Sequence, residues 1–395
     1  MVAGHLQEKN GTFYMVLNYS APDGKRKSKW ISTKLPVKGN KKRAEQLLTE
    51  TRRSFMPPEL SNTSTVSANM LFTDFMKLWL AIAKTTVKLT TYASYAAITN
   101  NIIIPYFEPM NKRLNEVKTI DIQKLYLSQL ERVSSNTVSH YHAVIHRAMK
   151  YAVTSDLIVV SPVDKVDRPK KNNYIGNHYS ADELQQLFEV AKGTKLELPI
   201  FFASFYGLRR SEVVGMKWNA IDFQQNTITI KHTLTSCNID GSLVEVAADT
   251  AKTKSSLRTL PLIPQFRDVL LMKWEQQEEY KRVCGRCYNK KYIDYICVDE
   301  MGNIIKPNYV TCSFSDLLKK YGLRKIRFHD LRHTCASLLL RNGIPMKQIQ
   351  EWLGHSDFST TANIYAHLEC DSKVLSAQAM LTGMSGALVS MENGA

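Results

Sequence analysis

Hydrophobic and polar positions in the first part of the chain follow the two-residue alternation of β-strands. Residues 12–19 form an apolar and aromatic run that ends near a Pro-Asp-Gly turn signal, and residues 27–32 alternate again. Residues 41–55 have a helical pattern instead. We therefore predict a small α+β domain over residues 1–56, built from a three-stranded sheet and one helix.

After residue 69 the apolar positions recur every three or four residues, which is the spacing of a helix with one buried face. Two helices are marked in this way, by Leu71, Phe75, Leu78, Trp79 and Ile82 and then by Val138, Ile145, Met149 and Ala152. Asn136 and Thr137 lie just before the second helix and are expected to cap it. Residues 69–162 are thus predicted to form a separate all-α domain, a helical bundle.

Two polar stretches that contain proline are expected to be linkers. Residues 56–68 are rich in Pro, Ser and Thr. The second linker, about residues 162–177, contains the run Arg168-Pro-Lys-Lys-Asn-Asn173. Its prolines and charges suit an extended connection that crosses a DNA backbone.

The last part of the chain, residues 174–385, has a mixed pattern. A capping-box sequence begins at Ser180 and opens a helix, strands are expected near residues 226–262, and further helices follow. We predict a mainly α domain with a small antiparallel β-sheet, followed by a short tail at residues 386–395. The chain as a whole is therefore expected to be multidomain.

Charge adds a partner to this picture. The formal net charge is +16 and the pI is about 9.4, which favours a polyanionic partner because Lys and Arg neutralise phosphates. In the first domain the basic residues are dense and alternate with aromatic ones, as expected of a sheet that contacts DNA, although a solvated surface would have the same composition. The candidate DNA contacts are Lys25, Arg26, Lys27, Lys29 and Trp30, with Lys170 and Lys171 in the second linker.

Two further patterns concern the compartment. No stretch approaches the roughly 20 apolar residues of a membrane span, and the first residues lack the pattern of a signal peptide. The 7 cysteines have no repeated spacing and suit reduced thiols, so we expect a cytoplasmic protein without a membrane partner. A zinc site at Cys284 and Cys287 is an alternative, but a single Cys-x-x-Cys is a weak signal.

Four motifs in the last domain carry residue types suited to phosphate chemistry. In chain order they are Tyr206-Gly-Leu-Arg209-Arg210-Ser-Glu212, Ala251-Lys252-Thr-Lys254, His329-Asp-Leu-Arg332-His333, and Leu353-Gly-His355-Ser356 with Tyr365-Ala-His367 soon after. Each also fits an ordinary role when taken alone. Gly354 would end a helix, His333 would pack in the core, and Tyr365 would be a half-buried tyrosine.

Together these residues form a coherent chemical set. Arg209 and Arg332 can pair with the nonbridging oxygens of one phosphate and stabilise the charge that builds there during attack. The Tyr365 hydroxyl is a weak nucleophile unless its anion is favoured, which nearby arginines and a histidine would do. A lysine on a mobile β-hairpin, Lys252, can protonate the leaving oxygen. No paired carboxylates appear, so no divalent metal ion is expected.

The order and spacing of these motifs closely resemble the catalytic signature of the tyrosine recombinase family. Residues 178–385 resemble its catalytic domain, residues 69–162 its SAM-like core-binding domain, and the first domain the arm-binding domain of phage and conjugative-transposon integrases. Arg209 is preferred over Arg210 because it directly follows Gly-Leu. The resemblance thus assigns six catalytic positions to Arg209, Lys252, His329, Arg332, His355 and Tyr365.

The resemblance implies a site-specific recombinase that integrates and excises a mobile element. Tyr365 would attack a phosphodiester, form a 3′-phosphotyrosine and release a 5′-hydroxyl, which then attacks the phosphotyrosine of a partner strand; neither ATP nor a cofactor is expected. A homotetramer on core and arm sites of double-stranded DNA is implied, with an excisionase or a host DNA-bending protein as accessory. A short C-terminal helix would dock on a neighbouring protomer through Val374, Leu375, Ala377, Met380 and Leu381.

Two other readings of the same residues remain open. A DNA-binding regulator that kept the fold without catalysis would be expected to lack Tyr365 or one of the arginines, and none is missing. A type IB topoisomerase shares the tyrosine chemistry but does not join two partner sites. The basic N-terminal domain and its linker favour an integrase that bridges separate DNA segments.

Overall fold

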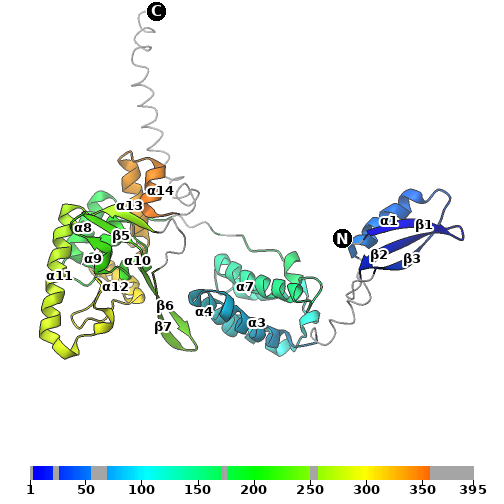
Figure 1. Ribbon diagram of the computed structural model, residues 1–395, viewed down its shortest axis with the longest axis horizontal. Coiled ribbons are helices and arrows are strands. Elements are labelled where there is room, and N and C mark those ends of the chain that lie inside the picture. The colour runs from blue at the N-terminus through cyan, green and yellow to red at the C-terminus, as the bar shows by residue number, and fades with distance from the viewer. Residues whose placement is uncertain are drawn as a thin grey trace, which may run out of the picture. The chain divides into compact units, whose positions relative to one another are not determined.

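A computed structural model describes residues 3–20, 26–54, 69–170, 172, 176–249 and 257–355. The chain divides into two units between Asn172 and Asn173, and Figure 1 shows the elements of each. Among the described residues, no helix is both long and apolar enough to cross a membrane.

The N-terminal domain is an antiparallel sheet with one helix on it. Strands β1 (Ala3–Lys9), β2 (Thr12–Ser20) and β3 (Arg26–Pro36) pair in the order β1-β2-β3, and α1 (Lys41–Ser54) packs on one face. Asn10 and Gly11 both have positive φ, as a two-residue hairpin turn between β1 and β2 requires. The predicted three-stranded sheet and helix are confirmed.

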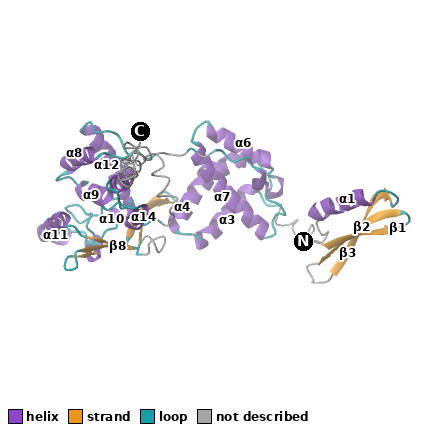
Figure 2. Ribbon diagram, turned by 90° about the horizontal axis from the view of Figure 1, so that it is seen from above, coloured by secondary structure: helices purple, strands orange, loops and turns teal. Residues whose placement is uncertain are grey.

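The rest of the first unit, called the helical unit below, is all helical, as predicted. No strand lies among its described residues between Phe72 and Thr154 (Figure 2). Its longer helices surround a core to which Phe75, Trp79 and the predicted apolar residues of α7 contribute. The elements are α3 (Phe72–Thr86), α4 (Leu89–Ile98), η1 (Thr99–Ile103), α5 (Ile104–Phe107), η2 (Glu108–Met110), η3 (Leu114–Glu116), α6 (Thr119–Leu130), α7 (Ser135–Thr154) and η4 (Pro162–Lys165).

Two details of these helices differ from the sequence prediction. Leu78 is 44% exposed, because the buried face of α3 is centred on Met76, Trp79 and Ala83 and Leu78 lies on the other side. The cap of α7 is Ser134, whose hydroxyl accepts the Thr137 amide, so the expected caps Asn136 and Thr137 lie inside the first turn.

The second linker begins later than predicted. Pro162 opens the short helix η4, and its carbonyl accepts a hydrogen bond of 2.8 Å from the Thr119 hydroxyl of α6. Asn172 is still attached to this unit, because its backbone exchanges two hydrogen bonds with the side chain of Asn136. Pro162 and Asn172 thus both contact the helical unit, where the sequence suggested an extended connection.

The second unit is mainly helical, as predicted, but it contains two small antiparallel sheets where the sequence analysis expected one. One sheet has the order β4-β5-β8, and β6 and β7 form a separate hairpin. Helix α13 packs against both α9 and α14. The elements are α8 (Ala181–Ala191), α9 (Glu197–Phe205), α10 (Arg210–Val214), η5 (Trp218–Ala220), β4 (Ile221–Asp222), β5 (Thr227–Ile230), β6 (Thr233–Ile239), β7 (Ser242–Ala248), β8 (Arg258–Pro261), α11 (Pro264–Cys284), η7 (Gly285–Cys287), η8 (Lys290–Tyr292), α12 (Pro307–Lys320), α13 (Asp330–Arg341) and α14 (Met346–Leu353).

Candidate active site

A tight turn between α9 and α10 places Arg209. Gly207 has a φ of +62°, and a Cβ atom at this position would lie 2.3 Å from Cδ2 of Leu353 at the end of α14. Only glycine allows both this backbone conformation and this close approach. Arg209 follows as the N-cap of α10, whereas the neighbouring Arg210 turns away and donates a 2.7 Å hydrogen bond to Thr311.

Helix α13 places Arg332 in the interior. The buried carboxylate of Asp330 accepts the backbone N–H of Arg327 at 2.9 Å and closes the first turn of this helix. Two residues further along the helix, Arg332 is only 2% exposed. Its Nη1 donates to the carbonyl of Gly207, so this arginine joins α13 to the turn that precedes Arg209.

Three arginines converge on the last carbonyls of α14. Arg258 Nε donates to the carbonyl of Trp352 at 2.8 Å, and Arg332 Nη2 to that of Leu353 at 2.7 Å. Arg209 Nη2 donates to the carbonyl of Gly354 at 2.9 Å. These consecutive carbonyls have no partner within the helix and carry its negative partial charge, which is why guanidinium groups stabilise this end.

One buried carboxylate connects two of these arginines. Glu212 is 3% exposed, and its Oε1 accepts Arg209 Nη1 at 2.7 Å. Its Oε2 accepts the backbone N–H of Arg209 at 3.0 Å and Nη2 of Arg258 at 3.1 Å. Although burial alone would raise the pKa of Glu212, the two guanidiniums and these hydrogen bonds hold it below its usual value.

Positive charge exceeds negative charge in this group of three arginines and one glutamate. Burial, followed by the charge of Arg209, lowers the pKa of Arg332 to about 9. The Arg332 guanidinium still keeps N–H groups beyond the two that bind carbonyls, since it has five in all. An arrangement of this kind favours an incoming anion, because an anion would relieve the repulsion between the guanidiniums.

Two of the predicted histidines are neutral near this group at pH 7. His355 directly follows Gly354, whose left-handed backbone ends α14, and it is 8% exposed. Burial, followed by the charge of Arg332, lowers its pKa to about 3. His329 begins α13; desolvation, followed by the charge of His333, lowers its pKa to about 4, although the residue as a whole is exposed.

The structure therefore brings Arg209, Arg332 and His355 together and places His329 one turn before Arg332. His333, which was expected to pack in the core, is half-buried, and its ring lies edge-on to that of His329 with 5.5 Å between centroids. The remaining predicted groups of the last domain, Lys252, Tyr365 and the C-terminal helix, lie outside the described residues.

The candidate DNA contacts of the N-terminal domain do not share one face of the sheet. Lys29 pairs in register with Leu17, which packs towards α1, so strand alternation puts Lys27 and Lys29 on the face that carries the helix. Trp30 is on the opposite face and is 45% exposed. Its ring lies 6.3 Å from that of Tyr14 between centroids, and Lys9 Nζ lies 5.8 Å from the centroid of the Trp30 ring.

Of the other predicted DNA contacts, only Lys170 has a described side chain. Lys170 is exposed, close to Asn172 with its hydrogen bonds to the helical unit. Lys25 and Lys171 lie outside the described residues, as does the side chain of Arg26.

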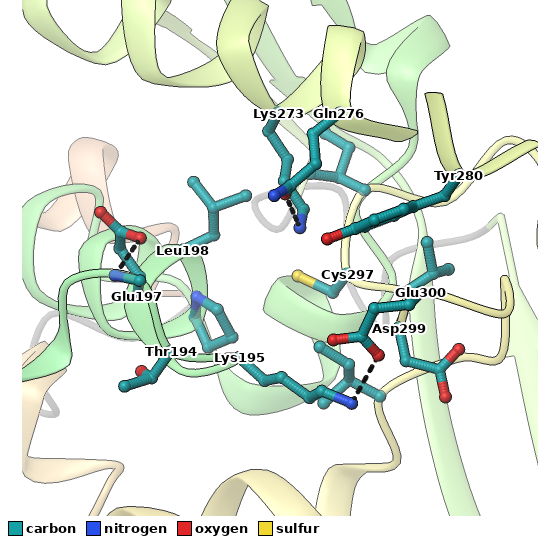
Figure 3. Close-up of a pocket in the computed structure, with 15 residues that line it drawn as sticks. Thr194, Lys195, Glu197, Leu198, Lys273, Gln276, Tyr280, Cys297, Asp299 and Glu300 are labelled. Atoms are coloured by element: carbon teal, nitrogen blue, oxygen red, sulfur yellow. Dashed lines mark hydrogen bonds and ion pairs between the residues drawn. The ribbon is translucent and has the colours of Figure 1, made fainter. Parts of the chain in front are cut away.

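A separate pocket of about 160 Å³ lies in the second unit (Figure 3), and no arginine lines it. Residues from α9, α11 and the chain around Cys297 line it, and Lys195 bridges to Glu300 at 2.8 Å on one side. None of the predicted catalytic residues lines this pocket.

Within the described part of the chain, no three His, Cys, Asp or Glu side chains are grouped as metal ligands would be.

The sequence motifs have counterparts in known families. Residues 178–371 match the model of the phage integrase family, and residues 71–130 match the N-terminal SAM-like domain of phage integrases. The chain therefore belongs to the tyrosine recombinases of the phage integrase family, enzymes that cleave and rejoin DNA in site-specific recombination.

Relatives at about a quarter identity extend over most of the chain. The tyrosine recombinase XerC-like protein of Caldanaerobacter subterraneus subsp. tengcongensis is 28% identical over 314 residues, which is 75% of this chain and 78% of the relative. The ICEBs1 integrase of Bacillus subtilis is 26% identical over 341 residues, which is 84% of this chain and 88% of the relative.

Solved structures show the same fold. The Tn1549 transposon integrase, in complex with transposon right end DNA, has a TM-score of 0.64 at 21% identity and covers 80% of this chain and 100% of its own. A lambda integrase dimer bound to a COC′ core site has a TM-score of 0.55 at 17% identity and covers 91% of this chain and 93% of its own. The predicted fold class is confirmed.

Sequence reasoning assigned no role to three residues that the structure brings into these sites. Glu212 stands three residues after Arg209, the spacing of a capping box, and this signal was present in the sequence. Arg258 opens a strand and has no local signal, because its partners lie on α10 and α14. Lys9 joins Trp30 only through the sheet register.

Proposed function

We propose that this recombinase holds the scissile phosphate with Arg209, Arg332 and His355 and attacks it with Tyr365. The observation that carries the proposal is the group of arginines at the end of α14, in which positive charge exceeds negative charge directly before His355. In the transition state the nonbridging oxygens gain charge, and guanidiniums already in place stabilise that charge without reorganisation.

The histidines contribute in their neutral forms. A neutral imidazole can both accept and donate a proton, so His355 can receive the phenol proton of Tyr365 or donate a hydrogen bond to the phosphate. An anionic phosphate next to His355 and Arg332 would raise their pKa values from the lowered ones. His329, at the start of the same helix as Arg332, orients the phosphate from the α13 side.

Lys252 is the general acid in this proposal. It lies in the segment between β7 and β8, and protonation of the 5′-oxygen by its ammonium group makes that oxygen a good leaving group. Tyr365 then carries a 3′-phosphotyrosine. The freed 5′-hydroxyl of a partner strand attacks that bond, restores the phosphodiester and releases the tyrosine, so the bond energy is kept and no ATP is used.

The DNA partners follow from the relatives and from the basic domain. Solved structures of similar fold include a lambda integrase tetramer bound to a Holliday junction, which supports a tetramer of this chain on core sites. The group of exposed Lys9 and Trp30 with half-buried Tyr14 supports a second, arm-type contact by the N-terminal sheet. Integration and excision of a mobile element, with an accessory DNA-bending protein or excisionase, is the activity that such two-site binding serves.

The test is covalent trapping on a nicked suicide substrate that carries the candidate attachment site. We expect an adduct that maps to Tyr365, forms equally in EDTA and is absent in Tyr365→Phe. Tyr321→Phe is the matched control, since Tyr321 is 47% exposed at the end of α12, and it should form the adduct normally. An adduct in Tyr365→Phe, or loss of cleavage on chelation, would overturn the proposal.

A second experiment distinguishes a recombinase from a topoisomerase. Two duplexes with different labels, each carrying the site, are incubated with the protein. Strand joining between the duplexes supports the recombinase. Relaxation of supercoiled DNA without any joined product favours the topoisomerase reading instead.

A further inference from the structure

We propose that Arg258 is a positioning residue for phosphoryl transfer, which holds Arg209 and the end of α14 in their working arrangement. The proposal rests on the roles given above to Arg209 and His355. Arg258 is 8% exposed, and its guanidinium contacts two separate elements. Nε donates to the Trp352 carbonyl of α14, and Nη2 donates to Glu212 of α10.

Each of these two hydrogen bonds of Arg258 leads to an element that carries a proposed catalytic group. Glu212 accepts both the side chain and the backbone N–H of Arg209, so Arg258 fixes the carboxylate that orients this arginine. The Trp352 carbonyl lies three residues before His355. One side chain of β8 therefore sets the distance between the turn that carries Arg209 and the helix end that carries His355.

The planar shape of guanidinium is essential to this role. Nε and Nη2 are separate donors on one edge of a rigid group, so they can serve two acceptors on different elements at once. A lysine has one nitrogen at the end of a flexible stem and does not reproduce this fixed geometry. Arg258→Lys thus keeps the charge and removes the link between α10 and α14.

The location of Arg258 suggests a competing role, which the experiment has to separate. Arg258 follows the segment that contains Lys252, so it could act by holding the general acid. The hydrogen bonds to Glu212 and Trp352 support a role on the side of Arg209 and His355 instead. A positioning role on this side affects stabilisation of the phosphate and delivery of the nucleophile, not protonation of the leaving group.

The experiment compares two DNA substrates with the full-length protein. One carries the ordinary phosphodiester at the cleavage site. The other carries a 5′-bridging sulfur, which leaves as a thiolate and needs no proton because thiols have a pKa near 8.5. The rate of covalent adduct formation is measured at saturating DNA for Arg258→Lys, Arg258→Ala and Lys252→Ala, together with DNA affinity and the thermal transition.

We expect Arg258→Lys to slow adduct formation about 10- to 100-fold, the size expected for a small misplacement of reacting groups. The slowing should be equal on both substrates, and DNA affinity should change less than about threefold. Lys252→Ala should be slow on the phosphodiester and close to wild type on the sulfur substrate. In Arg258→Ala, added guanidinium ion should restore part of the rate. Arg267→Lys is the matched control, because Arg267 on α11 also hydrogen-bonds one side chain, Asn226, and should have no effect.

Several results would overturn the inference. Wild-type rates in both Arg258 variants would show that the contacts have no role in the reaction. A defect that disappears on the sulfur substrate would assign Arg258 to the general acid. If the Arg258 variants lose DNA affinity or unfold, and guanidinium does not restore the rate, the role of Arg258 is only to stabilise the fold. An adduct in Tyr365→Phe would instead overturn the proposed function, so the two failures are distinguishable.

Discussion

The buried carboxylate of Glu212 allows a quantitative test of how the arginines are held. In Glu212→Gln one of the two oxygens becomes an NH₂ group, which must face N–H donors of Arg209 or Arg258. Removing one partner from a buried charge network costs about 3–5 kcal/mol, because the remaining charges stay buried without compensation. For a unit of 223 residues (Asn173–Ala395), this corresponds to a fall in the transition temperature of roughly 6–20 °C.

Glu183 provides the matched control for this substitution. It occupies the same capping-box position in α8 and binds Arg324 at 2.6 Å, but the side chains of Glu183 and Arg324 are 33% and 45% exposed. The corresponding values for Glu212 and Arg258 are 4% and 6%. Water screens the exposed pair, so Glu183→Gln should cost only about 1 kcal/mol.

The assay is differential scanning calorimetry of the full-length chain, with urea unfolding followed by tryptophan fluorescence as a second measurement. The transition of the second unit should fall in Glu212→Gln and change little in Glu183→Gln, while the transition of the first unit stays constant. Equal effects of the two substitutions would refute the reasoning, since burial is the main difference between the sites.

Two further predictions concern the same region. Gly207→Ala should destabilise the second unit by about 2–4 kcal/mol in urea unfolding, because the left-handed backbone costs about 1–2 kcal/mol and the contact with Leu353 adds overpacking; a loss below about 1 kcal/mol would contradict this. Stability should also fall as the pH drops from about 6.5 towards 4, since the unfolded chain takes up a proton at His355 while the folded chain, with a pKa of about 3, does not. The transition temperature of His355→Gln, measured over this range, should fall less steeply than that of the wild type. The corresponding difference in the slope of the free energy of unfolding is at most about 1.4 kcal/mol per pH unit. Parallel curves for the two proteins would show that His355 is not the source of the pH dependence.

Periodic burial made much of the fold predictable from the sequence. Val138, Ile145, Met149 and Ala152 were expected inside a helix bundle, and all four are fully buried. The spacing failed at Leu78, because an apolar residue at the border of a helix face is buried only if a neighbouring element covers it. Which element does so is a property of the tertiary packing and has no local signal.

The candidate site was predictable as a set of residue types, but its hydrogen-bond network was not. Arg209 and Arg332 were found through their motifs, and the structure brings both to α14. Their acceptors are backbone carbonyls, which every residue has and which no motif can mark. Arg258 was overlooked for the same reason, since a strand arginine becomes significant only when its distant acceptors are known.

The anchoring of α14 by three guanidiniums has a consequence for the proposed nucleophile as a tethered reactant. Gly354 is a fixed point, and Tyr365 follows it by 11 residues. A chain of that length reaches at most roughly 40 Å, whatever its path. The phenol is thereby confined to a small volume around the arginines, where its local concentration is on the order of millimolar or higher. Lengthening this tether would dilute the proposed nucleophile without altering the contacts of Arg209, Arg258 and Arg332 with the end of α14.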